Sequence, residues 1–549
     1  MKRVGKETWT LALPVLALLI WTVVYPNIAV IAGSFENGLG HWREFIGSPT
    51  DREALTTSIV ISIASVIASV IIGVPLAFLL SRFEFPGRRV LKAVATLPAA
   101  LPPLVGVIAF LFLYGESGIV TRAIQRLFGM SEAPWRLTGV WAIIFVHAYT
   151  MYVYVFLFVS AGLDRFDTTL DEAGAGLGAT PWQRLRRVTL PLLTPALAGS
   201  MLLVFMTSLG SFSAPYVFGG GIRVLSTQIV ASKLNGSMGL AYVETTVLAL
   251  SAVAGLLLFR WLEGKRKYTS SGKGGATRRV LKSRKTQIVA ALLSIITVVI
   301  LILPHLMVVL VSFARDGTWT TQVLPPDYTV DNYRRLFTEA QLWKPIMNSI
   351  WMSLIATAAN VVVCFVAAYL IVMRKFTGRK LLEILTALPW AIPATAIALG
   401  LAATFNRNDL LSLRVLLVGS FWILPLAYFI RNIPLVSTAV ESSLRQMDAS
   451  LEDAARGLGA SWGLTMRRVI LPAARPGLIA GGLLAAVTAV GEFVASVVLY
   501  THANRPISLE ILAQLRALAF GTAASYSVLL ILLVLGMTLT ARTLEERIA

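Results

Sequence analysis

Two polar loops repeat one spacing of acidic, glycine, arginine and proline residues, a chemistry that suits a surface on which another protein docks. The first loop covers 171–191 and the second covers 452–472, and their shared positions are 281 residues apart. The shared positions are Glu172, Ala173, Gly174, Gly178, Arg186, Arg187 and Pro191 in the first loop, and Asp453, Ala454, Ala455, Gly459, Arg467, Arg468 and Pro472 in the second. Both loops lie between long apolar segments. We therefore expect one docking surface that is used twice.

Each loop carries the residues that begin and end two short helices. Acidic residues favour the N-terminus of the first helix because the helix dipole is positive there. Gly178 suits the left-handed conformation that ends a helix, and Thr180 is a typical N-cap for the next one. The second loop repeats this order with Gly459 and Ser461. The second short helix is expected to end at Pro191, so that each loop forms a compact knob.

The elements that must position these loops are membrane helices. Of the 549 residues, 56% are hydrophobic and 14% are charged, whereas a soluble domain is about a quarter charged. Apolar runs of about 20 residues, long enough to cross a bilayer, recur along the chain. We predict twelve spans, at 9–33, 56–81, 93–114, 138–162, 196–218, 241–262, 287–313, 347–373, 382–405, 413–436, 477–500 and 521–543.

The net charge of +20 does not indicate a nucleic-acid partner, because lysine and arginine concentrate on one side of the predicted spans. This asymmetry predicts that the N- and C-termini and both polar loops are cytoplasmic. The apolar stretch that follows Lys2, Arg3 and Lys6 is too long for a signal peptide, so we expect a retained first span. The single cysteine, Cys364, excludes a disulfide framework.

The chain is an internal duplication. Matching positions are 291 residues apart before the first polar loop and 281 residues apart within it, so the second copy is ten residues shorter. The shortening falls in an external loop, 115–137 against 406–412. We assign 1–263 and 287–549 to two six-span halves with the same span order, a parallel repeat. The basic segment 264–286 between them is expected to be a flexible cytoplasmic linker, or one that touches anionic lipid headgroups.

The sequence contains no motif that would let this chain supply the energy for transport itself. No G-x-x-x-x-G-K-[ST] phosphate-binding loop is found. The four histidines are scattered, no nucleophile motif or spaced set of metal ligands appears, and no metal site is predicted. The chain is therefore expected to be non-catalytic, with any ATP bound by a separate subunit.

The loop pattern resembles the EAA loop of ABC importer permeases, E-A-A-x3-G-x9-I-x-L-P. The departures are mild: Gly174 replaces alanine, Asp453 replaces glutamate, and Val188 and Val469 replace isoleucine. Among fused twelve-span permeases the chain looks most like the ferric-iron group, with the thiamine and 2-aminoethylphosphonate permeases close behind. The resemblance implies an all-α membrane protein with the type I importer fold in the bacterial cytoplasmic (inner) membrane.

The same resemblance implies partners and a mechanism. Two copies of a cytoplasmic ABC ATPase, which bind ATP and Mg, would dock on the two loops, and the chain itself would bind no cofactor. An external or periplasmic solute-binding protein would deliver the solute, with ferric iron favoured. Thiamine, 2-aminoethylphosphonate and other small solutes remain alternatives. Transport would proceed by alternating access between the two halves.

In that family the fifth span of each half helps to line the transport path, which makes Ser211 and Glu492 candidate lining residues and Phe212 and Phe493 candidate gates. We treat Glu492 as the one carboxylate inside a span, about 22 Å along its helix. An intramembrane ionisable residue marks a pathway or a paired structural site, and both interpretations stay open. With Ser211 at the matching position, Glu492 would make one wall acidic. His147 is interpreted as a packing histidine.

A different class of protein also has two parallel six-span halves, the secondary transporters of the major facilitator type. Such a carrier would use a proton or ion gradient and would need no ATPase. An intramembrane carboxylate such as Glu492 favours it, because carboxylates serve in proton relays. The paired polar loops argue against it, because such a carrier has no reason to keep them.

Overall fold

The computed structural model describes residues 6–164, 168–264, 279–280, 283–319, 321–406, 412, 414–448 and 450–546. Within them, helices dominate, and β1 (Phe83–Glu84) pairs in parallel with β2 (Arg279–Val280). The expected linker 264–286 lies mostly outside the described residues. Its residues 279 and 280 form β2, so this part is a strand and not the structureless tether that the composition suggested.

The first half of the chain contains α1 (Lys6–Leu19), η1 (Ile20–Val24), α2 (Tyr25–Ser34), α3 (Gly40–Gly47), α4 (Pro49–Arg82), α5 (Arg88–Thr96), η2 (Leu97–Ala100), α6 (Pro103–Tyr114), α7 (Ile119–Leu127), α8 (Gly139–Asp164), α9 (Thr168–Gly176), α10 (Pro181–Arg184), η3 (Leu185–Thr189), α11 (Leu190–Leu192), α12 (Thr194–Leu209), α13 (Ser213–Phe218), α14 (Leu225–Leu234) and α15 (Met238–Gly264).

The second half contains α16 (Arg284–Ser312), α17 (Asp331–Thr338), α18 (Ala340–Met373), α19 (Arg379–Ala391), α20 (Ala394–Thr404), α21 (Ile423–Gln446), α22 (Ser450–Gly457), α23 (Trp462–Thr465), η4 (Met466–Ile470), α24 (Leu471–Val490), α25 (Val494–Leu499), α26 (Ile507–Arg516) and α27 (Phe520–Glu546).

Ten helices in the described residues are long and apolar enough to cross a membrane, and two bent helix pairs bring the number to twelve. The pairs are Pro181–Leu192 with Thr194–Leu209, bent by 66°, and Arg379–Ala391 with Ala394–Thr404, bent by 109°. Each of the twelve overlaps one predicted span. The prediction 413–436 was wrong at both ends, because its first apolar residues precede α21 and the backbone of Leu417 bonds to Phe405 instead.

The predicted duplication is confirmed helix by helix. Helices α4 and α18 are both 34 residues long and begin 291 positions apart. Helices α15 and α27 are both 27 residues long and begin 282 positions apart. Helix α7 falls in the loop that the sequence predicted to be external and longer in the first half. The described residues contain no counterpart of α7 between α20 and α21.

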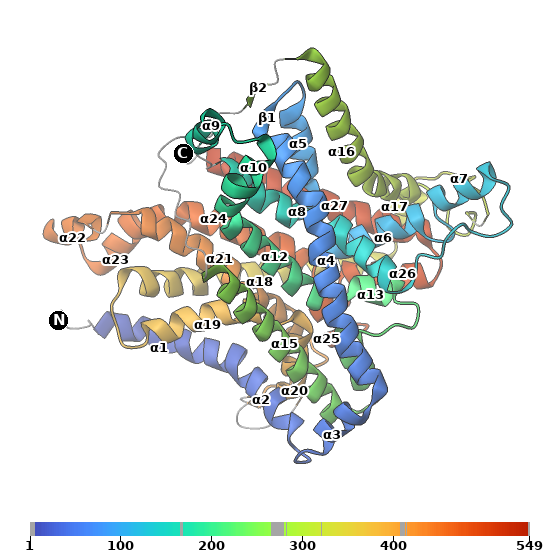
Figure 1. Cartoon of the computed structure of the whole chain (residues 1–549). Coiled ribbons are helices and arrows are strands. Elements are labelled where there is room, and N and C mark those ends of the chain that lie inside the picture. The colour runs from blue at the N-terminus through green and yellow to red at the C-terminus, as the bar shows by residue number, and fades with distance from the viewer. Residues whose placement is uncertain are drawn as a thin grey trace.

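The first span of each half packs on the other half, which the sequence did not indicate. The ring of Trp21, in η1, lies 5.1 Å from that of Phe405, beside α20. In the reciprocal contact, the hydroxyl of Tyr149 on α8 lies 2.6 Å from Nδ1 of His305 on α16. The N-terminal parts of these two spans accordingly lie in the buried core of the opposite half, whereas Val30 and Val308, nearer their C-terminal ends, lie in the core of their own half. Figure 1 shows α1 running beside α19 and α16 beside α5.

Candidate functional site

The first polar loop folds as the sequence predicts at its glycine. Gly178 has φ +79°, and two bonds close the end of α9: Gly178 N–H to Ala175 O and Ala179 N–H to Gly174 O, each 3.0 Å. This is a Schellman cap, which requires a residue in the left-handed region. Thr180 then caps α10, accepting from the backbone N–H of Gln183 at 3.3 Å.

The second polar loop has the same geometry. Gly459 has φ +82°, and the N–H of Ala460 bonds to Ala455 O at 3.0 Å. Ser461 caps α23 by accepting from the N–H of Leu464 at 3.3 Å. We call α9 with α10 the first knob and α22 with α23 the second knob. Figure 1 shows the knobs apart on one face, which we call the knob face, opposite α3, α7 and α17.

The second short helix of the first loop ends at Leu192, one residue after Pro191, where the chain bends by 66° into α12, as the sequence predicts. In the second loop the prediction was wrong, because α24 runs through Pro472. A turn of π-helix, η3 or η4, precedes each proline. The N–H of Leu190 bonds to Leu185 O, five residues back. Because proline has no N–H to place in the regular ladder, a widened turn directly before it costs no additional bond.

An acidic residue just before each motif acid anchors its knob to the end of a span. Asp171 accepts from Arg82 at 2.7 Å, where α4 ends. Glu452 accepts from Arg374, next to α18, at 2.9 Å and from Arg456 at 2.8 Å. The motif acids themselves, Glu172 and Asp453, are exposed. A basic residue at the end of the second span of each half was the signal for these anchors in the sequence.

The second anchor has a defined response to pH. The pKa of the Glu452 carboxyl group is lowered overall. Burial alone would raise this pKa, but the hydrogen bonds and positive charges of Arg374, and then of Arg456, outweigh burial. A glutamate in the unfolded chain has a pKa of about 4.3, and above this pH the ionised Glu452 contributes its full stabilisation to the fold. This stabilisation is lost as the pH falls through the lower pKa that Glu452 has in the folded chain. We expect α22 to keep its protection from hydrogen exchange at about pH 5 and to lose it below about pH 4.

The control for this experiment is Arg374→Gln, which removes the main partner of Glu452. We expect α22 to exchange faster in this variant already at neutral pH, after correction for intrinsic rates. Equal exchange of α22 in the variant and in the original chain would show that the ion pair does not anchor the knob.

Each knob also presents a large apolar side chain that the sequence analysis missed. Leu177 and Leu458, directly before the glycines, are 89% and 90% exposed. Trp182 on the first knob is 66% exposed, and it has a glycine, Gly463, at the matching position of the second. Ala173, Ala454 and the four predicted arginines, Arg186, Arg187, Arg467 and Arg468, are exposed as well. The signal in the sequence was a leucine before the glycine in both copies.

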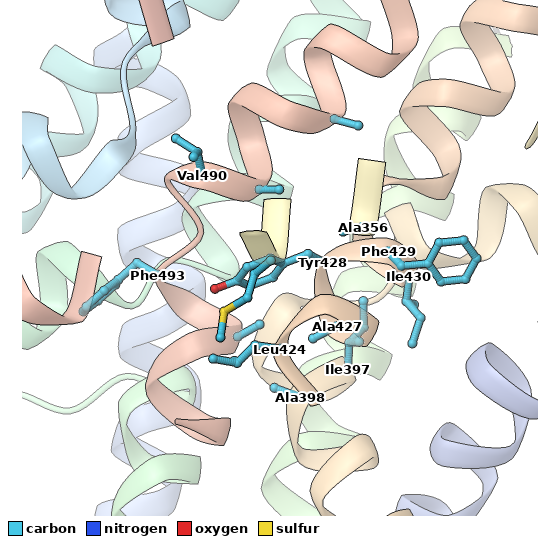
Figure 2. Close-up of a cluster of buried hydrophobic side chains, with 14 of the residues drawn as sticks. Ala356, Ile397, Ala398, Leu424, Ala427, Tyr428, Phe429, Ile430, Val490 and Phe493 are labelled. Atoms are coloured by element: carbon cyan, nitrogen blue, oxygen red, sulfur yellow. The ribbon is translucent and has the colours of Figure 1, made fainter. Parts of the chain in front are cut away.

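The fifth span of each half breaks at the predicted path residues and meets the opposite half there. The rings of Phe212 and Phe493 lie 5.8 Å apart, and both side chains are buried. A Cβ built on Gly491 would lie 2.6 Å from Pro102, and one on Gly210 would lie 3.7 Å from Pro393. These contacts are reciprocal, so the two breaks meet near the axis that relates the halves. Figure 2 shows Phe493 at the break after Val490.

Glu492 is paired, and this corrects the expectation of an acidic wall. Its carboxylate lies 3.0 Å from Nε of Arg431 and accepts from Nη1 of Arg431 at 3.2 Å. The backbone N–H of Ala495 donates to the same carboxylate at 3.0 Å. Arg431 lies on α21, and Thr150 stands at its position in the first half. Sequence reasoning missed Arg431, although a basic residue within an apolar span was visible.

Ser211, which takes the place of Glu492 in the first half, binds a histidine. Its hydroxyl lies 2.9 Å from Nε2 of His147. The hydroxyls of Ser65 and Ser208 each lie 3.0 Å from Nδ1 of the same ring. His147 is 1% exposed, which supports its interpretation as a packing histidine that joins α4, α8 and the break after α12.

Glu492 is not the one carboxylate within a span, so that statement was wrong. Glu244 lies on α15 inside the predicted span 241–262, and its side chain is fully buried. In the part of the chain that the structure describes, no group of three or more His, Cys, Asp or Glu residues is placed to hold a metal ion.

Comparison with known proteins decides the family. The model of the binding-protein-dependent transport system inner membrane component matches residues 55–268 and again residues 360–549. The chain belongs to this family. The duplicated match agrees with the repeat of helices described above, and the chain is a fused permease of the ABC importer type.

The relatives of this permease include proteins that are named for different substrates. It is 30% identical to a probable ABC transporter permease, y4fN of Sinorhizobium fredii, over 91% of this chain and 88% of the relative. It is 26% identical to the ferric transport system permease FbpB of Actinobacillus pleuropneumoniae, over 96% and 77%. It is 29% identical to the sulfate transport system permease CysW of Synechocystis, over 45% and 88%.

Proposed function

We propose that this permease is the membrane subunit of an ATP-driven importer that passes ferric iron from an external or periplasmic solute-binding protein into the cytoplasm. The observation that carries the proposal is the pair of equivalent knobs, each with a glycine cap between its two helices and an exposed leucine directly before that glycine. Two equivalent surfaces on one chain suit two copies of one partner. That partner is a cytoplasmic ABC ATPase, which binds ATP and Mg, while the permease itself is non-catalytic.

The orientation follows from the same assignment. The knob face lies in the cytoplasm of a bacterial cell, together with both termini, and α3, α7 and α17 lie outside the inner membrane. This orientation agrees with the excess of lysine and arginine in the segments on the knob side. The solute-binding protein then docks on the opposite face.

The knobs are suited to move the two halves. Ion pairs tie each knob to the second span of its own half, through Asp171 and Arg82 or Glu452 and Arg374. When two ATPases close on ATP, a push on a capped helical knob is passed to these spans as a rigid-body movement. The contact between Phe212 and Phe493 then separates, because it joins the two halves.

The choice of ferric iron as the substrate rests on sequence similarity alone. The ferric relative covers nearly the whole chain, which favours iron over the sulfate relative that covers less than half. The Arg431–Glu492 pair is neutral overall, so the path offers no charge argument for a cation, and thiamine, 2-aminoethylphosphonate and oxyanions remain alternatives. A secondary carrier is disfavoured because the family model matches both halves.

Uptake into proteoliposomes tests the proposal. The permease is reconstituted with its co-purified ATPase and enclosed ATP, and binding proteins loaded with ferric iron, sulfate or thiamine are added outside. We expect uptake of labelled iron and stimulated ATP hydrolysis only with the iron-loaded binding protein. If a binding protein loaded with sulfate or thiamine stimulated ATP hydrolysis instead, that solute and not iron would be the substrate. Solute uptake by the chain alone along a proton gradient would overturn the importer assignment.

A further inference from the structure

Two carboxyl groups are buried together at the end of the first half away from the knobs. Glu244 on α15 is fully buried, and Asp51, in the first turn of α4, is 2% exposed. Both acids bind the same face of α14 (Leu225–Leu234), Asp51 through Gln228 and Glu244 through Ser232, one helical turn apart. We call these two residues with Gln228 and Ser232 of α14 the acid corner. It is distinct from the path residues and from the knobs.

The hydrogen bonds of the acid corner leave one oxygen of Glu244 without a donor. The hydroxyl of Ser232 donates to Oε1 of Glu244 at 2.7 Å, and the amide of Gln228 donates to Oδ1 of Asp51 at 2.8 Å. Oε2 of Glu244 is buried and has no other hydrogen-bond partner. A buried charged oxygen without a donor is costly, so this atom requires an explanation.

The surrounding charged groups do not compensate the two acids. Arg223 donates to the side-chain oxygen of Gln228 at 3.1 Å and is exposed. On α3, which packs against α15, His41 lies 3.5 Å from Glu44. Among the described residues, the side-chain donors that bind the two acids are Gln228 and Ser232, and both are neutral. Two adjacent buried carboxylates cannot both be ionised under these conditions.

The helix geometry indicates which of the two acids is neutral. Asp51 is the third residue of α4, and its own N–H is held by the N-cap Ser48 at 3.2 Å. A negative charge is favoured at this position because the helix dipole is positive at its N-terminus. Glu244 lies within α15 and has no such support. Asp51 is therefore the carboxylate, and Glu244 is the group that has to carry a proton.

The second half provides an internal comparison. Tyr526 stands at the position of Glu244, and Leu342 stands at the position of Asp51. The phenol of Tyr526 donates to the backbone oxygen of Leu342, so a neutral O–H group joins the same two helices there. The acid of that corner, Glu510, is compensated by Arg505 at 2.9 Å. In the second half, a neutral O–H donor therefore stands on the sixth span at the position of Glu244.

We propose that Glu244 is a protonated carboxylic acid whose Oε2–H donates to the Asp51 carboxylate, which makes the acid corner a binding site for a single proton. The proton accounts for the oxygen without a donor, for the absence of a basic partner and for the match with Tyr526.

Whether the acid corner holds its proton affects a contact between the two halves. Helix α14, which supplies Gln228 and Ser232, also carries Lys233, and the ammonium group of Lys233 donates to the backbone oxygen of Val498 in the second half. Loss of the proton would place two like charges beside α14 and push it outward. The Lys233 contact, which joins the halves on the face opposite the knobs, would then weaken.

The test compares Glu244→Gln with Glu510→Gln in the full chain, by thermal unfolding in detergent from about pH 6 to about pH 10. A glutamine at 244 keeps both hydrogen bonds of the neutral acid, because its amide donates to Asp51 and accepts from Ser232. We expect this variant to be at least as stable as the original chain, with an advantage that grows as the pH rises. Glu510→Gln removes the charge that Arg505 requires and is expected to lower the unfolding temperature.

Two results would overturn the proposal. If Glu244→Gln destabilised the chain as much as Glu510→Gln, the carboxylate charge at 244 would be required. If sodium or calcium ions stabilised the original chain but not the variant, the corner would hold a metal cation and not a proton. Infrared spectroscopy gives a direct check, since we expect the carbonyl band of a protonated carboxylic acid to disappear in Glu244→Gln, and its persistence would contradict the assignment.

Discussion

Replacing Leu177 and Leu458 together with aspartate is expected to abolish ATP-driven transport while the permease still folds and inserts. Both side chains are about nine-tenths exposed, so neither supports the fold of the permease. A leucine that is buried in a partner protein would contribute about 1.5–3 kcal/mol to the binding free energy. An aspartate that is buried there without a partner opposes binding instead. Each ATPase copy loses one such contact, which corresponds to at least about tenfold weaker association at each knob.

The measurement for this prediction is ATP hydrolysis and solute uptake in proteoliposomes, together with thermal unfolding of the purified permease. Leu127→Asp is the matched control, because Leu127 on α7 is 78% exposed on the face opposite the knobs. We expect the control to keep its ATPase. A double knob variant that retains the ATPase and transports at the original rate would show that these leucines are not docking residues.

Replacing Arg431 with alanine is expected to destabilise the permease strongly, because it leaves the carboxylate of Glu492 buried at 7% exposure without its cationic partner. Breaking a buried ion pair from one side costs about 3–5 kcal/mol. Since the side chain of Arg431 is 38% exposed, water screens the pair, and we expect about 2 kcal/mol here. Thermal unfolding in detergent measures the difference.

A double-mutant cycle separates this charge effect from simple loss of packing. Glu492→Gln removes the charge of the carboxyl group while keeping its shape. The double variant Arg431→Ala with Glu492→Gln is then expected to be more stable than Arg431→Ala alone. If the two single effects simply add in the double variant, the pair contributes nothing as a pair, and our account of Glu492 is wrong.

The spans and the knobs were predictable from the sequence because each depends on local chemistry. Hydropathy over about 20 residues identifies a membrane helix wherever it packs, and Gly178 and Gly459 mark caps that only a left-handed residue accepts. Span boundaries were less predictable where apolar residues continue beyond a helix. Val415 belongs to such a stretch, which lies before α21 and not within it.

The exchange of first spans and the pairing of buried charges were not predictable, because each depends on which distant segments meet. Nothing near Trp21 in the sequence indicates that it packs against Phe405 of the other half. Glu492 was recognised as unusual, but its partner Arg431 is 61 residues earlier. Glu244 was overlooked because a single acid barely lowers the hydropathy of its span. The two-fold repeat was the most useful guide, since equivalent positions can be compared within one chain.

Native mass spectrometry of the intact complex tests the claim that each knob seats one ATPase. We expect two ATPase copies on the permease, one copy when either Gly178→Pro or Gly459→Pro is present, and none when both are present, because proline cannot adopt the positive φ of these caps. An ATPase count that is the same in the original chain and in the double variant would contradict the claim.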